Sequence, residues 1–328
     1  MRQSKTNIAS RICCRRLGWR LLVYLLVTCL QLTAVYCQAG TYLLVKSGKG
    51  EIYSRFEKSL GMALADSNSQ NNLTARDIDT FKSQQNTLAM DHYDAIISAG
   101  IDASIAVSAL QTDTRVFMAM LPRASYSQLS ASGEIACKIK NCWTVFLDQP
   151  VIRQLQLLKL VMPNAQQVAV MSSHQSASLA NEITNAAGKY GLHIKDIEVT
   201  DEDSVLSTLK QDLANSDVLM AIPDPIIYNR NTARAILLST FYQHIPLFAY
   251  SRSFVRAGAT FGIYSTPEEI ARYVAELVTT KTNIPSTTPW LFPKYYTIDI
   301  NQRAADALGI DSEDSDLLAK RLKAYENE

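Results

Sequence analysis

The chain has 328 residues, 47% hydrophobic and 19% charged; this composition excludes a disordered or fibrous protein, and the length suggests two domains. The formal net charge of +1 hides an asymmetry, because residues 1–39 hold six Lys and Arg and no acidic residue, so removing that +6 leaves −5 for the rest. A mildly acidic body without clustered Lys and Arg argues against nucleic acid as a partner.

The N-terminus is typical of a secretory signal peptide covering residues 1–39. A basic region ends at Arg20, an apolar run follows over 21–35, and small residues after it suit cleavage. The run is short for a membrane span, which needs about 20 residues. Two alternatives stay open, an uncleaved anchor and a lipoprotein site at Cys29 or Cys37. The sequence therefore predicts an exported protein.

Apolar runs alternate with helical segments along the first half of the mature chain. Helices are expected over 51–65 and from 100 to about 110, where apolar residues recur at helical spacing. Buried strands are predicted over 41–46, 94–98, 115–121 and 143–147.

The alternation begins again near residue 148, where Asp148 is expected to cap a helix that runs to 161. The last stretch, 312–328, is charged and is expected to be a solvated helix or to fray. Further helices are predicted over 176–190, 204–214, 229–243 and 267–279 and after Asn301. Further strands are predicted over 168–171, 193–199, 217–222, 245–250, 260–264 and 295–300.

Repeated β-α-β units with buried strands predict parallel sheets covered by helices on both faces. The fold class is therefore α/β, with two doubly wound parallel-sheet lobes. We expect lobe one over 40–147, lobe two over 148–284, and a C-terminal segment over 285–328 that returns to the lobes.

Two cysteines lie clearly in the mature chain, Cys137 and Cys142, with four residues between them. In an oxidising compartment this spacing predicts a short-loop disulfide, with free thiols as the alternative. The four histidines show no metal-ligand spacing, so neither a metal nor another cofactor is expected.

The second half resembles the ABC-transporter substrate-binding family whose known members bind aromatic amino acids, within the periplasmic binding protein superfamily. The resemblance covers about 145–310 well and 40–145 loosely. Two departures are Asp224-Pro-Ile-Ile227, where members often carry Asp-Asn-Thr, and Asn141-Cys-Trp-Thr144, which replaces Asn-x-Thr-Gly. The matching stretches are Leu157–Val170, Ala187–Leu192, Ser216–Pro225, Ile245–Phe248, Phe254–Ala259 and Ile300–Ile310.

Ligands of open parallel sheets bind beyond the carboxyl ends of the strands, which narrows the candidate residues. Ser98 and Gly100 precede a helix and could hold a carboxylate, with a simple strand-to-helix turn as the alternative. Asp224 could pair with a ligand ammonium, with a role as N-cap or loop acid as the alternative. Arg123 and Arg252 could clamp an anion, although a solvated arginine is the simpler interpretation. The predicted ligand-binding residues are Ser47, Lys49, Ser98, Gly100, Ser172, Asp224, Tyr228 and Tyr250.

The resemblance implies two lobes joined by a hinge, with a ligand cleft between them, and a location in the periplasm. It implies a monomeric solute-binding protein that captures a small molecule, such as an amino acid, and presents it to a membrane permease or a sensor protein. An enzyme is not expected, because the chain has no Gly-x-Ser-x-Gly, His-Glu-x-x-His or dinucleotide glycine fingerprint. The alternative is a pair of lobes that has lost its ligand and serves as a protein-interaction module, which would have an apolar or occluded cleft.

Overall fold

A computed structural model describes residues 39–85, 88–135, 141–280 and 289–326. The predicted signal peptide, apart from its last residue, and Cys137 lie outside the described residues. The signal peptide and the Cys137–Cys142 disulfide therefore stay predictions. None of the helices in the described ranges is long and apolar enough to cross a membrane.

The first sheet has the order β11-β5-β4-β3-β1-β2, and all of its strand pairs are parallel. Its central strands are continuous apolar runs, as expected for a parallel sheet that is buried on both faces. The strands are β1 (Thr41–Lys46), β2 (Asn72–Asp77), β3 (Ala95–Ala99), β4 (Arg115–Leu121), β5 (Cys142–Phe146) and β11 (Trp290–Leu291).

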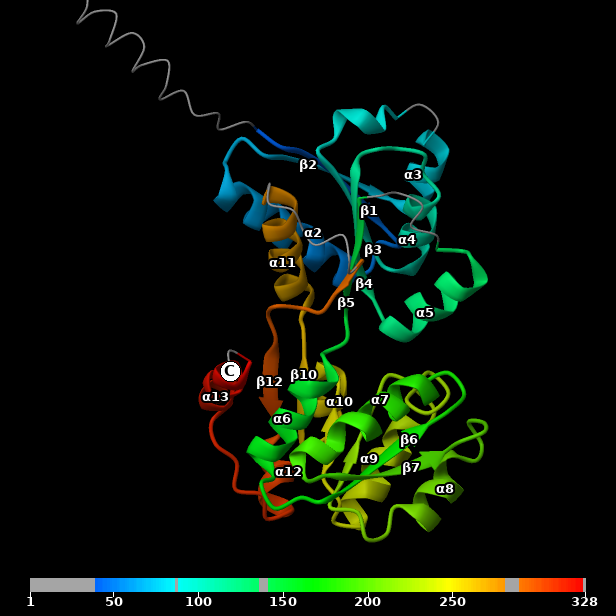
Figure 1. Cartoon of the computed structure of the whole chain (residues 1–328), viewed down its shortest axis with the longest axis vertical. Helices are drawn as coiled ribbons and strands as arrows, with labels where there is room; N and C mark the ends of the chain where they lie inside the picture. Colours follow the sequence, from blue (N-terminus) through cyan, green and yellow to red (C-terminus); the bar gives the residue numbers. More distant parts are fainter. Residues whose placement is uncertain (1–38, 86–87, 136–140, 281–288, 327–328) are drawn as a thin grey trace, which may run out of the picture. The chain divides into compact units, whose positions relative to one another are not determined.

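Helices cover both faces of this sheet (Figure 1). Successive side chains of β1 alternate between the faces, so that Leu44 packs with one helix layer and Leu43 with the other. One layer is α2 (Glu51–Ser67) with α11 (Pro267–Thr279), and the other is α3 (Ile78–Gln84) with α4 (Ile101–Ser108). The 3-10 helix η1 (Met90–His92) and α5 (Arg123–Ser132) lie in the connections.

Helix α11 departs from the expected division of the chain, because we placed 148–284 in lobe two. Its buried residues Ile270 and Val274 pack with α2 and the first sheet. The physical reason is that the chain returns to the first lobe after β10 and buries the apolar face of α11 there. The other expected boundaries stay predictions.

The second sheet has the order β12-β10-β9-β8-β6-β7, parallel except for β12, which pairs antiparallel with β10. The strands are β6 (Gln167–Ser172), β7 (His193–Glu198), β8 (Val218–Met220), β9 (Leu247–Ala249), β10 (Phe261–Tyr264) and β12 (Thr297–Ile300).

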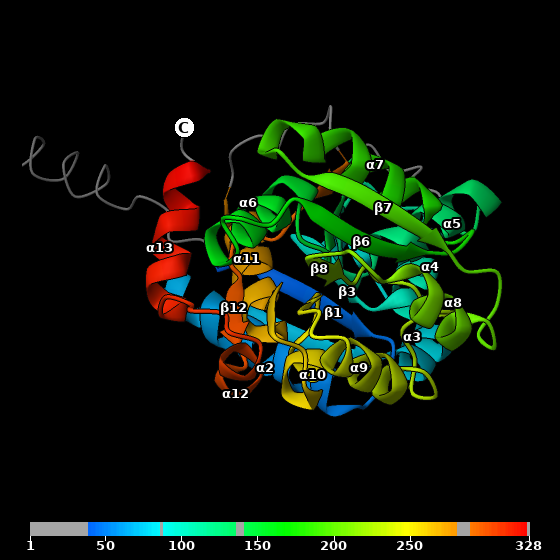
Figure 2. The same ribbon diagram turned by 90° about the horizontal axis from the view of Figure 1, so that it is seen from below.

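Two helix layers enclose this second sheet as well (Figure 2). On one face lie α6 (Val151–Val161) and α7 (Ala177–Ala187), which continues into the 3-10 helix η2 (Gly188–Tyr190). On the other face lie α8 (Val205–Asp212), α9 (Ala233–Tyr242) and α10 (Arg252–Ala257). The chain ends with α12 (Gln302–Ala307) and α13 (Ser315–Tyr325).

The charged C-terminal stretch does not fray in the structure. Leu318 and Leu322 of α13 are fully buried in the core that contains α6. Arg153 on α6 also forms an ion pair with Glu326 and lies 4.4 Å from the ring centroid of Tyr296. The high charge of 312–328 favoured a solvated segment. The two leucines nevertheless form an apolar stripe on one face of an otherwise polar helix, and this face is buried.

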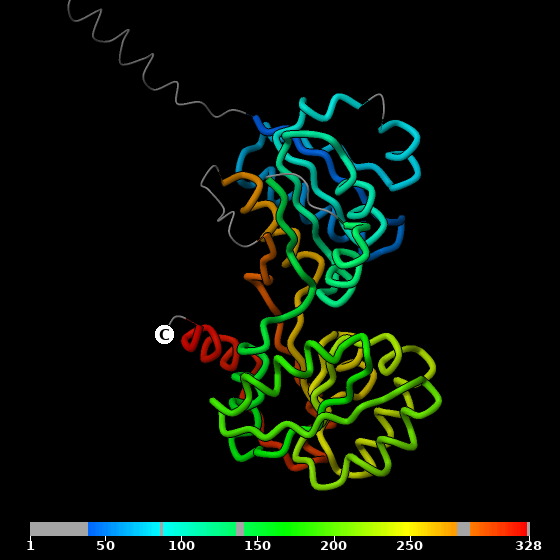
Figure 3. The backbone as a smooth tube through the Cα atoms, turned by 45° about the vertical axis from the view of Figure 1, so that its right-hand side comes forward, coloured from blue at the N-terminus to red at the C-terminus, as the bar shows by residue number. Residues whose placement is uncertain are grey.

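Three described segments connect the two lobes: the one from β5 to α6, the one from β10 to α11, and the one from β11 to β12 (Figure 3). Hydrogen bonds tie these segments together. Gln149 Nε2 donates to Ser265 Oγ at 2.8 Å, and Ser265 Oγ donates to the carbonyl oxygen of Tyr295 at 2.6 Å. Arg153 donates to Gln149 Oε1 at 2.8 Å and to the carbonyl oxygen of Pro293 at 2.9 Å. This network links the three connecting segments to one another, beside the cavity that is described in the next subsection.

Candidate functional site

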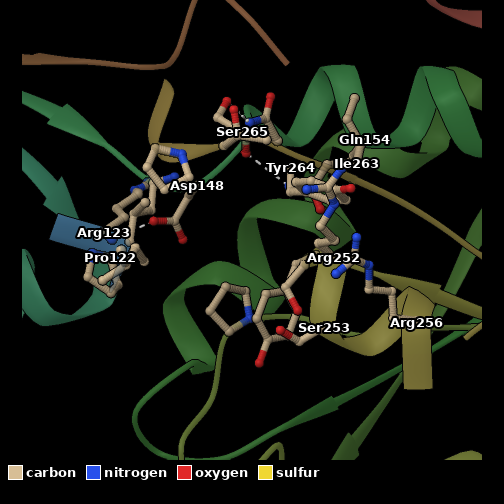
Figure 4. Close-up of a pocket in the computed structure, with 18 of the residues that line it drawn as sticks. Pro122, Arg123, Asp148, Gln154, Arg252, Ser253, Arg256, Ile263, Tyr264 and Ser265 are labelled. Carbon is tan, nitrogen blue, oxygen red and sulfur yellow. Dashed lines mark hydrogen bonds between the residues drawn. The ribbon is translucent and has the colours of Figure 1, made fainter. Parts of the chain in front are cut away.

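A cavity of about 920 Å³ is lined by side chains from both lobes and from the connecting segments (Figure 4). This volume is within the range of small-molecule sites, about 300–1,000 Å³. First-lobe residues at the cavity include Arg55, Pro122 and Arg123; second-lobe residues include Arg230, Tyr250, Arg252 and Arg256; the connections supply Asp148, Gln149 and Ser265.

The ends of parallel strands position much of this lining. Pro122 and Arg123 follow β4, and Tyr250 and Arg252 follow β9. The carboxyl ends of parallel strands lie at the same edge of a sheet, where ligands of α/β folds bind. The location therefore agrees with the general rule, although most of the side chains at the cavity differ from those we predicted.

Two of the cavity arginines are paired with carboxylates. Arg55 on α2 binds Glu268 on α11 through two hydrogen bonds, Nε to Oε1 at 2.7 Å and Nη2 to Oε2 at 2.9 Å. Arg123 Nη2 lies 2.6 Å from Glu182 Oε2 on α7, so this ion pair joins the first lobe to the second. The charges of these two guanidinium groups are thus largely balanced by protein carboxylates.

Asp148 occupies the connection between the lobes and lines the cavity (Figure 4). Its Oδ2 accepts a hydrogen bond from the backbone N–H of Arg123 at 2.6 Å, while its Oδ1 is buried without a hydrogen-bond partner. Burial raises the pKa of this carboxyl, opposed by the hydrogen bond from Arg123. The prediction that Asp148 caps α6 is wrong, because Pro150 is the N-cap residue and the carboxylate turns to Arg123 instead.

An aromatic cluster lies beside the cavity on the second lobe. The ring centroid of Tyr250 is 6.0 Å from that of Tyr228 and 5.6 Å from that of Phe254. Tyr250 lines the cavity, and burial together with the nearby Asp224 raises its pKa to about 12, so the phenol stays protonated. Tyr228 is buried behind it and its hydroxyl has no hydrogen-bond partner among the described residues.

The structure brings the predicted residues Ser47, Ser98 and Gly100 together, but it uses them to join β1 and β3 to α4. Ser47 Oγ accepts from the N–H of Ala103 at 2.9 Å, and Ser98 Oγ lies 2.8 Å from Ser104 Oγ. The N–H of Gly100 donates to the carbonyl oxygen of Ala119 at 2.9 Å.

Glycine is required at position 100, where φ is +92° and a Cβ would lie 2.7 Å from Ser47 Oγ. The donors we expected to hold a carboxylate are therefore engaged within the protein.

Lys49 and Ser172 likewise have partners outside the cavity. Lys49 is exposed and its Nζ lies 3.6 Å from Asp77 Oδ2. Ser172 is buried and its Oγ donates to Asp196 Oδ1 at 2.7 Å. Neither residue is among those that line the cavity.

Asp224 is a buried loop acid with both oxygens engaged. Oδ2 accepts hydrogen bonds from Ser173 Oγ and Ser176 Oγ, each at 2.6 Å, and from the backbone N–H of Ser173 at 3.2 Å. Oδ1 accepts from the N–H groups of Ile226 at 2.8 Å and Ile227 at 3.2 Å. These bonds correspond to the alternative interpretation of Asp224, and they leave no obvious acceptor for a ligand ammonium.

Of the eight predicted ligand-binding residues, Tyr250 alone lines this cavity. The sequence offered Arg123 and Arg252 as lesser candidates, and both do line it. No sequence pattern marks Arg230, which lies in a loop, Arg256, which lies on the short helix α10, or Asp148, which lies in a connection. Among the described residues no cluster of His, Cys, Asp and Glu could hold a metal ion.

Two α/β lobes with mostly parallel sheets and a cavity lined from both define the architecture of periplasmic binding proteins. The sequence profile of the ABC transporter substrate binding protein family matches residues 140–322, more than half of the chain, and the protein belongs to this family. The expected family and fold class are therefore confirmed. No curated protein sequence matches the chain.

Solved structures of this fold are similar to the chain. A ligand-free, open substrate-binding protein with adhesive properties from Clostridium difficile has a TM-score of 0.65 at 16% identity, covering 84% of this chain and 96% of its own. An ABC domain in complex with L-Trp from Streptococcus pneumoniae has a TM-score of 0.56 at 17% identity, and the match covers 85% of this chain and 98% of that domain. At these identities the likeness concerns the fold.

Proposed function

We propose that the protein is exported and, as a monomer, captures a small molecule such as an amino acid in the cavity between its lobes. Closure of the lobes on the ligand would then be recognised by a membrane transporter or a sensor protein. The observation that carries this proposal is the cavity of about 920 Å³ lined by side chains from both lobes. Membership of a substrate-binding family supports it, and the similar structure in complex with L-Trp supports an amino acid.

The composition of the cavity favours binding over a protein-interaction module without a ligand. Such a module would have an apolar or occluded cleft, whereas this cavity holds arginines, the carboxyl group of Asp148 and the amides of Gln149 and Gln154. Polar groups that converge on a cavity are the usual means of orienting a small ligand. Binding without chemical transformation is also the function of the family to which the chain belongs.

Thermal unfolding of the purified protein tests this proposal, using free amino acids, small carboxylates, sugars and nucleosides. A ligand at about 100 times its dissociation constant stabilises the folded state by about 2.7 kcal/mol, which raises the melting temperature by several degrees. A selective shift with one class supports solute binding and names the class. If no compound shifts the melting temperature of folded, ligand-free protein, the interaction-module alternative replaces the proposal.

A further inference from the structure

Three guanidinium groups at the cavity have no ion-pair partner among the described residues. These are Arg230, in the loop after β8, and Arg252 and Arg256, both on α10. All three follow parallel strands of the second sheet, so they lie on the second-lobe side of the cavity. Their charges face a space that a ligand would fill.

Arg252 and Arg256 form the centre of this charged side. They are four residues apart on α10, so they lie on one face of the helix, and Figure 4 shows both at the same side of the cavity. Like charges at this spacing repel each other and destabilise a helix. An anion that binds both groups would remove this repulsion.

The other charged groups at the cavity do not cancel the positive charge of these three arginines. Arg55 and Arg123 are balanced by Glu268 and Glu182. The carboxylates that line the cavity and have no ion-pair partner in the described chain are Glu51 and Asp148. In the described chain these three arginines outnumber the two carboxylates, so the cavity has a net positive charge, which favours ligands of the opposite sign.

We propose that the cavity selects a small organic anion whose carboxylate or phosphate group is held by Arg252 and Arg256. This inference rests on the proposed function and adds the chemical class of the ligand. Guanidinium groups suit both anions, because their planar donors form paired hydrogen bonds with carboxylate and phosphate oxygens.

The test compares anionic probes with neutral partners of similar shape on protein purified from the full-length chain. The pairs are benzoate with benzamide, indole-3-acetate with indole-3-acetamide, and glucose 6-phosphate with glucose. The first two pairs report on a carboxylate and the third on a phosphate. Affinities come from thermal unfolding and calorimetry at low and high salt. Arg252→Gln and Arg256→Gln are compared with Arg303→Gln, which removes an exposed arginine outside the cavity.

We expect at least one anion to bind while its neutral partner does not, and each cavity variant to weaken binding about ten- to hundred-fold. The Arg303 variant should bind like the parent protein, and all three variants should melt like it without ligand, since these side chains are exposed. Anion binding that survives both cavity substitutions would overturn the assignment to Arg252 and Arg256. Neutral probes that bind as tightly as the anions would overturn anion selection and leave solute binding intact. If none of the six probes binds, anion selection is overturned, whereas solute binding is decided by the wider panel of compounds described under the proposed function.

Discussion

At the scale of single residues, Asp224 organises the loop that follows β8. Its two oxygens accept hydrogen bonds from two serine hydroxyls and three backbone N–H groups while the residue is 2% exposed. Asp224→Ala leaves these donors buried without an acceptor, and each such group costs about 1–3 kcal/mol. We expect urea unfolding to show a loss of about 3 kcal/mol or more.

The matched control for this change is Asp113→Ala, which removes an exposed acid in lobe one and should cost less than about 0.5 kcal/mol. Equal losses for the two variants would contradict the structural role of Asp224. A folded Asp224→Ala protein that had lost only its ligand affinity would restore the ammonium site predicted from the sequence.

Asp148 should make stability depend on pH. Burial raises the pKa of its carboxyl, so the folded state holds the proton more tightly than the unfolded chain does. The stability that this provides is present at low pH and is lost as pH rises through the raised pKa. Asp148→Asn does not titrate and its carbonyl oxygen can still accept from the N–H of Arg123.

We therefore expect the free energy of unfolding of the parent protein to fall relative to that of Asp148→Asn as pH rises from about 4 towards 8. Urea unfolding of both proteins across this range measures the difference. A difference that is constant with pH, or that grows in favour of the parent, would show that the carboxyl is not held in its protonated form.

At the scale of elements, α13 offers two adjacent leucines with opposite surroundings. Leu318 is fully buried against the core that contains α6, whereas Leu317 is 48% exposed. Leu318→Ala should lower the free energy of unfolding by about 2–5 kcal/mol, because it removes apolar contacts and leaves a cavity. Leu317→Ala should change it by less than about 0.5 kcal/mol. Similar small losses for both, measured by urea unfolding, would mean that α13 does not dock.

Elements with a strong apolar pattern were predicted well from the sequence. The expected strands over 41–46 and 115–121 have the bounds of β1 and β4. Strand β2 was missed, because it is an edge strand whose sequence, Asn-Leu-Thr-Ala-Arg-Asp, lacks a continuous apolar run. A strand that is buried on both faces has a continuous apolar run, which makes it recognisable in the sequence. An edge strand lacks such a run.

The site was predicted less well, because the direction of a side chain depends on tertiary neighbours. The rule that ligands bind at strand ends led to Asp224 and Ser98, and both lie at such ends. Asp224 is bonded by serines about 50 residues earlier in the sequence, and Ser98 by a serine six residues later, so both side chains are engaged in internal hydrogen bonds. Asp148 and Arg256 have no sequence pattern that distinguishes them from ordinary connection and surface residues.

At the scale of the whole molecule, the ion pair between Arg123 and Glu182 joins the two lobes beside the cavity. Its Nη2 and Oε2 atoms are 2.6 Å apart, and the two side chains are 31% and 38% exposed. A pair so exposed contributes about 0–1 kcal/mol to stability. Even so, it can restrict the relative movement of the lobes. The connecting segments already keep the two lobes near each other, and this ion pair links them at a further point.

Glu182→Gln should therefore broaden the distribution of distances between the lobes while hardly changing the free energy of unfolding. Single-molecule energy transfer between dyes at the exposed positions 113 and 210, one on each lobe, measures this distribution. The matched control is Glu313→Gln, which breaks the Arg321–Glu313 pair of similar exposure near the C-terminus. Salt at about 0.5 M should abolish the difference, because it screens exposed pairs. If Glu182→Gln and Glu313→Gln give the same distribution at low salt, this ion pair does not restrain the lobes, and their movement is set by the connecting segments alone.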